Sequence, residues 1–275
     1  MLETKDLTIR FGGHVAVDHV SCAFVPGTLT SIVGPNGAGK TTYFNLISGQ
    51  LPASEGQVLL GGEDITTMPA AVRTQRGLGR AFQLTQLFPN LTVHENVRLA
   101  IQAREAGRGR GGLDLWRVWS DHKAWIDEAS QLLEQVHLAD KARASASSLP
   151  HGDQRKLEVA LLLALDPKVF MFDEPTAGMS VDEVPVVLDL IRQLKARKDI
   201  VILLVEHKMD VVRELSDRIV VLHNGQLVAD GEPAEVIASP VVQQAYLGGA
   251  ATEAGPLAAA DGTPARPLPA ERGGS

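Results

Sequence analysis

The feature that most constrains this chain is a glycine-rich octapeptide, Gly34-Pro35-Asn36-Gly37-Ala38-Gly39-Lys40-Thr41. An apolar stretch typical of a strand (residues 29–33) precedes it, and a helical pattern (residues 40–48) follows it. Glycines let backbone N–H groups turn inward around phosphates, helped by the positive end of the following helix. We expect Lys40 to reach the β- and γ-phosphates and the Thr41 hydroxyl to ligate Mg²⁺. The order strand, loop, helix therefore predicts a P-loop nucleotide-binding protein without saying which kind.

A second candidate element is the apolar run of residues 169–172, which ends in the acids Asp173 and Glu174. In a P-loop protein the first acid holds the Mg²⁺ shell, and a second acid can polarise the attacking water. Acids at the end of a buried strand can also be simple helix caps. The matching loop makes the catalytic interpretation of the pair the stronger one. The loop and the acid pair together predict nucleotide hydrolysis.

The order of periodic segments predicts an α/β architecture. Strand patterns fill the first sixty residues, and helical spacing appears at residues 92–104 and 124–136. Helices are then predicted at 154–165 and 184–197, between near-continuous apolar strands at 169–172 and 200–205. Such strands between helices indicate a parallel sheet covered on both faces. Asn224-Gly225 predicts a late hairpin.

Composition limits the class of protein and its compartment. The 275 residues carry a net charge of −7, which argues against a nucleic-acid partner. The single cysteine, Cys22, excludes an internal disulfide and is expected to be a small buried side chain in a strand. No apolar run approaches the ~20 residues that a membrane-spanning helix needs, and the N-terminus has no signal pattern. Any membrane role is therefore expected to act through partners, from the cytoplasmic face.

Two segments are predicted to lack fixed structure. From residue 248 to residue 275 the chain is rich in Ala, Gly and Pro, and such a tail buries too little apolar surface to offset its ordering entropy. Residues 107–112, Gly-Arg-Gly-Arg-Gly-Gly, are interpreted as a solvated linker, with an arginine contact to a phosphate or lipid headgroup as the alternative.

Over residues 2–247 the chain resembles the ATP-binding subunits of ABC transporters. Besides the loop and the acid pair, four elements match the family in order: Phe11, Gln83 in Arg80-Ala81-Phe82-Gln83, the signature segment Leu149-Pro150-His151-Gly152-Asp153-Gln154, and Glu206-His207. Each alone has a structural explanation, as a core or surface residue or a helix start. Their joint order makes coincidence a poor explanation.

The resemblance assigns a role to each matching residue. It implies catalytic roles for Lys40, Gln83, Glu174 and His207, and Mg²⁺ contacts for Thr41, Gln83 and Asp173. Phe11 would stack on adenine. ATP would also be contacted by the loop and the signature: Gly34, Pro35, Asn36, Gly37, Ala38, Gly39, Lys40, Thr41, Thr42, Pro150, His151, Gly152 and Asp153.

The resemblance also implies an architecture and a set of partners. A P-loop core with a mixed sheet, an antiparallel β subdomain and a helical subdomain (about 84–165) would form one ATPase domain over residues 1–247. Two such subunits would close head-to-tail around two ATPs. They would drive two membrane permease subunits through residues 84–96, where Leu87-Phe88-Pro89 could form an apolar contact or instead pack inside the helical subdomain.

The signature departs from the family pattern, L-S-G-G-Q. Pro150 replaces the serine that donates to the opposing γ-phosphate, His151 replaces a glycine, and Asp153 replaces the glutamine. Proline offers neither a hydroxyl nor an N–H. Ser180 also stands where the family usually has aspartate. These changes beside an intact P-loop side predict an asymmetric heterodimer with a second, different ATPase subunit.

The stretch 149–179 and the long insert at 104–125 resemble the subfamily that imports branched-chain amino acids. That resemblance implies a periplasmic substrate-binding protein as an indirect partner. Importers of urea and other amides share the cassette type, and the ATPase of lipopolysaccharide export is closely related. Soluble ABC ATPases acting on ribosomes or DNA are disfavoured by the single cassette and the acidic balance.

Overall fold

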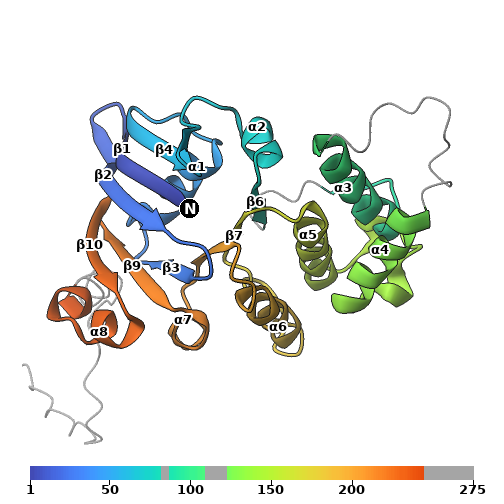
Figure 1. Cartoon of the computed structure of the whole chain (residues 1–275). Helices are drawn as coiled ribbons and strands as arrows, with labels where there is room; N and C mark the ends of the chain where they lie inside the picture. Colours follow the sequence, from blue (N-terminus) through green and yellow to red (C-terminus); the bar gives the residue numbers. More distant parts are fainter. Residues whose placement is uncertain (82–86, 109–122, 245–275) are drawn as a thin grey trace, which may run out of the picture.

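The computed structural model describes residues 1–81, 87–108 and 123–244, and two sheets organise them (Figure 1). The smaller sheet is antiparallel, with the strand order β2-β1-β4-β5. It comprises β1 (Leu2–Phe11), β2 (His14–Phe24), β4 (Glu55–Leu60) and β5 (Glu63–Asp64). Strands β1 and β2 form a hairpin in which Phe11 pairs with His14, so both residues lie at the turn.

The larger sheet is mixed, with the order β10-β9-β3-β8-β7-β6. Strands β9, β3, β8, β7 and β6 run parallel, whereas β10 pairs antiparallel with β9. The bounds are β3 (Leu29–Val33), β6 (Leu78–Ala81), β7 (Val169–Asp173), β8 (Val201–Val205), β9 (Arg218–His223) and β10 (Gln226–Gly231). Because β3, β7 and β8 are parallel neighbours, the residues that follow them meet at one edge of the sheet.

Helix α1 (Lys40–Ser48) packs in the core that joins the two sheets. Its Tyr43 and Phe44 are fully buried among side chains from both sheets, such as Leu7 and Ile32. The Tyr43 hydroxyl hydrogen-bonds the Thr4 hydroxyl at 2.7 Å, which satisfies both polar groups in the interior. The first helix is thereby fixed to the antiparallel sheet as well as to the mixed one.

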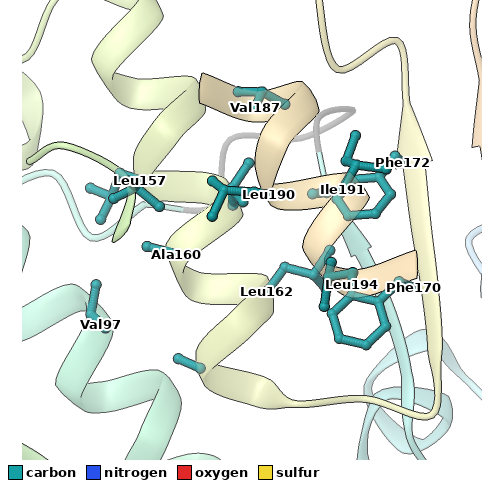
Figure 2. Packing of buried hydrophobic residues seen from close by; sticks show 14 of the residues in the cluster. Val97, Leu157, Ala160, Leu162, Phe170, Phe172, Val187, Leu190, Ile191 and Leu194 are labelled. Atoms are coloured by element: carbon teal, nitrogen blue, oxygen red, sulfur yellow. The ribbon is translucent and has the colours of Figure 1, made fainter. Parts of the chain in front are cut away.

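A second core joins the helices to the other side of the mixed sheet. It involves α3 (Val93–Gly107), α4 (Lys123–Gln135), α5 (His151–Leu165) and α6 (Val184–Lys195). Figure 2 shows α5 between α3 and α6, with side chains of α6 facing Phe170 and Phe172 of β7. Helix α3 begins with a capping box, in which Thr92 and Glu95 satisfy each other's backbone N–H groups. The remaining helices are short: α2 (Ala70–Gln75), η2 (Ala139–Lys141), η3 (Ala146–Ser148), α7 (Met209–Leu215) and α8 (Pro233–Ala238).

The predicted mixed α/β fold is confirmed, and β3 and α1 have the predicted bounds. Helix α5 begins at His151, three residues before the predicted start, so His151, Gly152 and Asp153 belong to its first turn. The sequence did not reveal β5, β6, α2, α7 or α8, because these elements of two to seven residues show neither a helical period nor a long apolar run like those of β7 and β8.

Cys22 is buried in β2, as predicted. The predicted tail (248–275) and most of the Gly/Arg segment (109–112) lie outside the described residues; Arg108, just before them, hydrogen-bonds Asp166 at 2.9 Å. Across the described parts of the chain, no helix is both long enough and apolar enough to span a bilayer.

Candidate functional site

The P-loop turns tightly between β3 and α1, and two glycines make the turn possible. At Gly34 a Cβ atom would lie 2.1 Å from the Leu222 carbonyl oxygen. At Gly39, just before α1, the backbone is left-handed (φ 96°), and a Cβ would meet the Ala16 carbonyl oxygen at 2.5 Å. Any larger residue would push the loop away from the neighbouring backbone, so the glycines fix where the α1 N-terminus points.

Lys40 folds back across the loop that it terminates. Its Nζ donates to the carbonyl oxygens of Gly34 at 2.7 Å and Pro35 at 2.9 Å. Burial lowers the pKa of Lys40, while the nearby charges of Glu174 and Asp173 oppose that shift. The ammonium group is therefore held at the centre of the loop, where an anionic group would find both a cation and the helix N-terminus.

Glu174 and His207 meet at the edge of the sheet where β7 and β8 end. Glu174 has a left-handed backbone (φ 53°) and its N–H donates to the Val205 carbonyl at 2.9 Å. The His207 Nε2 lies 2.7 Å from Glu174 Oε1, and both side chains remain partly exposed. The pair places a carboxylate, a group that can accept a proton from water once it is free of the imidazole, beside a second titratable side chain.

Glu206 anchors the loop that carries His207. It is buried, and one carboxylate oxygen accepts from the backbone N–H groups of His207 at 2.8 Å and Lys208 at 3.2 Å. The other oxygen accepts from the Thr176 hydroxyl, two residues after Glu174. The same carboxylate therefore ties together the two loops that present Glu174 and His207.

Lys40, Glu174 and His207 line one small cavity of about 280 Å³. Its walls are the P-loop and the two residues of the acid–imidazole pair, joined by two residues of β2 that sequence reasoning missed: Asn36, Gly37, Ala38, Gly39, Lys40, Thr41, Thr42, Glu174, His207, His14 and Ala16. Phe11 is half-exposed at the β1–β2 turn beside His14. His14 and Ala16 reach the cavity because β2 packs closely against the P-loop, and local sequence does not specify that packing.

The shape and chemistry of this cavity fit a nucleotide phosphate group with Mg²⁺. The loop provides glycines where side chains would clash, together with a buried ammonium group. Thr41 lines the cavity, and Asp173 directly precedes the lining residue Glu174; both side chains offer hard oxygen atoms of the kind that Mg²⁺ prefers in small number beside phosphate oxygens. Asp173 is buried at the end of β7, and burial raises its pKa while the Arg80 guanidinium opposes that rise.

The signature residues lie elsewhere, at the start of α5. Pro150 precedes the helix and provides no side-chain hydrogen bond to cap it. A Cβ on Gly152 would lie 2.1 Å from the Glu183 carboxylate, so a larger residue here would require that flexible side chain to move. Asp153 is buried and bonded to Lys141 and Lys156. Burial would raise the pKa of Asp153, but these two hydrogen bonds outweigh it and hold the pKa below its usual value.

A larger hollow of about 730 Å³ lies between the two cores, walled by α2, β6, α3 and α5. Phe88 lines it and is 56% exposed, whereas Leu87 packs partly buried against the helical core. Leu87 therefore packs inside the helical subdomain, one of the two alternatives for this pair. Phe88 remains exposed, as the other alternative, an apolar contact with a partner, requires. Gln83 lies outside the described residues. Arg80, which precedes it, borders the hollow and contacts Asp173, a link that the sequence did not suggest.

Comparison with known proteins agrees with this geometry. Residues 17–177 match the ABC transporter family, and residues 226–252 match a family described as branched-chain amino acid ATP-binding cassette transporter. The chain is 37% identical to the high-affinity branched-chain amino acid transport ATP-binding protein LivG of Escherichia coli, over 90% of this chain and 98% of LivG. It is equally identical to BraF of Pseudomonas aeruginosa, which carries the same description, with the same coverage.

Solved structures give the same result. A nucleotide-free ATP-binding cassette of an ABC transporter superposes with a TM-score of 0.74 at 30% identity. An ATP-binding cassette in its ADP conformation gives the same TM-score at 32% identity, and each comparison covers 90% of this chain and 98% of the other. The sequence match over more than half of the chain and the shared fold lead to one conclusion: this chain belongs to the ABC transporter family, as an ATP-binding cassette.

Proposed function

We propose that this chain is the ATP-hydrolysing subunit of an importer for branched-chain amino acids. The observation that carries the proposal is the Glu174–His207 pair at the mouth of the P-loop cavity. The names of LivG and BraF supply the substrate class. The chain would act as a peripheral subunit on the cytoplasmic face of the inner membrane.

In the proposed mechanism each residue has a distinct task. Lys40 exchanges its loop carbonyls for the β- and γ-phosphates, and Phe11 stacks on the adenine. Thr41 and Asp173 would hold Mg²⁺, with Gln83 as a further ligand, and a metal ion bound there would supply positive charge to offset that of the phosphate oxygens. His207 turns from Glu174 to the γ-phosphate and thereby releases the carboxylate. Glu174 then accepts a proton from the water whose oxygen bonds to the γ-phosphorus, while the bond from that phosphorus to the leaving ADP breaks.

The hollow beside Phe88 is the proposed contact for a permease subunit. It lies between the P-loop core and the helical core, with α2 and β6 on one side and α3 and α5 on the other. A segment seated there would contact both cores, so their relative movement would be transmitted to it. Two permeases, and a periplasmic binding protein that delivers substrate to them, complete the proposed assembly.

The partner across the nucleotide is proposed to be a different ATPase subunit. Pro150 lacks the donor that the family serine supplies, and Asp153 is held by two lysines inside the helical region. Loss of one donor to a transition-state phosphate costs ~2.7–4 kcal/mol. The ATP bound to this P-loop would meet the partner's signature, whereas the partner's ATP would meet the weaker one.

Two measurements test the proposal. Affinity-tagged chain should co-purify with integral membrane proteins, and the complex in liposomes should take up labelled leucine only with internal ATP and the binding protein. Uptake of labelled urea or an amide instead would replace the substrate class and leave the ATPase assignment intact. Purified chain that brings no membrane protein from its native membrane would contradict the transporter role.

A further inference from the structure

Arg80 is the last long side chain of β6 before the segment that carries Gln83, and its side chain is only 6% exposed. One nitrogen, Nη2, donates to Asp173 Oδ2 at 2.6 Å. The other, Nη1, donates to the Asn45 Oδ1 at 2.7 Å and the Ser48 hydroxyl at 2.9 Å, both near the end of α1. The guanidinium also lies 5.5 Å from the centre of the Phe44 ring.

These contacts connect the two elements that carry the proposed magnesium ligands. Thr41 lies in the first turn of α1, and Asp173 ends β7. Asn45 follows Thr41 by one helical turn, so a group bonded to Asn45 restrains the same helix. One planar, rigid donor group bonded to both elements restrains the distance between them.

We infer that Arg80 is a positioning residue for magnesium. It holds Asp173 by one carboxylate oxygen, leaves the other oxygen for the metal shell, and fixes α1 relative to β7. Arg80 also borders the hollow beside Phe88, so whatever occupies that hollow lies against the side chain that holds Asp173. This inference rests on the proposed function, because it requires that the P-loop binds a magnesium nucleotide.

Arg73 provides a matched control in the same core. It is fully buried and contacts the same end of α1, donating to the carbonyl oxygens of Leu46 at 2.7 Å and Ile47 at 2.6 Å. It also donates to the carbonyl oxygens of Met68 and Thr66. A change at Arg73 therefore disturbs the packing of α1 without touching Asp173.

The test measures metal binding rather than turnover. The full chain is loaded with a non-hydrolysable ATP analogue, and Mn²⁺ in place of Mg²⁺ is titrated while free Mn²⁺ is followed by electron paramagnetic resonance. Arg80→Gln should weaken Mn²⁺ binding by about 10-fold or more, the usual cost of losing a partner that orients a metal ligand. The Mn²⁺ affinity of Arg80→Lys should lie between the affinities of Arg80→Gln and the unchanged chain. Arg73→Lys should lower the unfolding temperature and leave the Mn²⁺ affinity unchanged.

A second titration distinguishes failure of the Arg80 inference from failure of the proposed function. Analogue binding in EDTA should differ by less than about threefold between Arg80→Gln and the unchanged chain, since Arg80 reaches no residue of the loop itself. Unchanged Mn²⁺ affinity in Arg80→Gln, or an equal loss in Arg73→Lys, overturns the inference alone. Failure of the unchanged chain to bind the analogue would instead reject the proposed function. If Arg80→Gln does not fold, wild-type Mn²⁺ affinity in a folded Arg80→Lys overturns the inference.

Discussion

The P-loop cavity and the start of α5 differ in how their polar side chains are bonded, although the family resemblance assigns ATP contacts to both. At the cavity, Lys40, Glu174 and His207 line open space, and their polar atoms bond one another or the loop. At the start of α5, Asp153 is enclosed by lysines and Pro150 has no donor to present. The polar groups of the first region face a cavity that a ligand can enter, whereas the charged groups of the second are bonded mainly to one another.

In this chain the P-loop motif is intact and the signature motif is altered, so substitutions in the two motifs should have different effects. Changes at the cavity should alter nucleotide chemistry with little effect on folding. Changes at the start of α5 should alter stability, or the activity of the partner's site. Four substitutions separate these effects, from the largest expected change to the smallest.

Glu174→Gln should reduce ATP hydrolysis by the assembled transporter by ~10²–10⁴-fold, because the amide cannot take a proton from water. ATP binding should persist. Glu183→Gln is the matched control beside the signature, since its carboxylate bonds Ser180 and lines no part of the cavity. Equal losses from both variants, measured by phosphate release, would contradict the division between the two regions.

Lys40→Met should weaken ATP binding by ~10–100-fold, the effect of losing a charge-assisted contact to phosphate. The folded state should remain, because removing a buried ammonium group also removes its desolvation cost. Fluorescence titration with a labelled ATP measures the affinity, and circular dichroism checks the fold. ATP affinity within twofold of the unchanged chain, at about equal stability, would show that Lys40 does not face the phosphates.

Asp153→Asn should lower the free energy of unfolding by ~1–3 kcal/mol, because Lys141 and Lys156 lose a charged partner. The folded pKa of Asp153 is depressed, so its stabilisation is present above the unfolded pKa of about 3.9 and is lost as the pH falls through the folded pKa. The gap between variant and wild type in urea unfolding should therefore shrink below about pH 4. ATP binding at the P-loop should not change.

Pro150→Ser restores the hydroxyl that the family signature supplies, and it should have the smallest effect. If the partner's site is slow because of this chain, total ATPase of the complex should rise, by at most about twofold, since a repaired site adds no more turnover than the intact one gives. The same change in a complex whose partner carries a glutamine in place of its catalytic acid should give no rise. A rise there would mean that Pro150 acts on the other site.

Several parts of the molecule could be read from local sequence. The P-loop, the apolar strands and the acids that end β7 depend on residues that are adjacent in the chain, and their chemistry requires particular residue types at fixed spacing. The family assignment and the α/β fold followed from them and are confirmed. The short elements α2, α7 and β6 could not be predicted, because their order comes from packing rather than from periodicity.

What the sequence determined by itself is the loop, from Gly34 to Thr41, and the kind of ligand that it holds, since backbone N–H groups and a lysine suffice to select phosphate. Tertiary structure alone decided what surrounds that ligand. It brought Arg80 to Asp173 across 93 positions and Glu206 to Thr176 across 30. At the start of α5 it also brought Lys141 to Asp153, which already pairs with Lys156 one helical turn along the same helix. Such contacts depend on how parallel strands and packed helices are arranged in space, and no local sequence pattern specifies that arrangement.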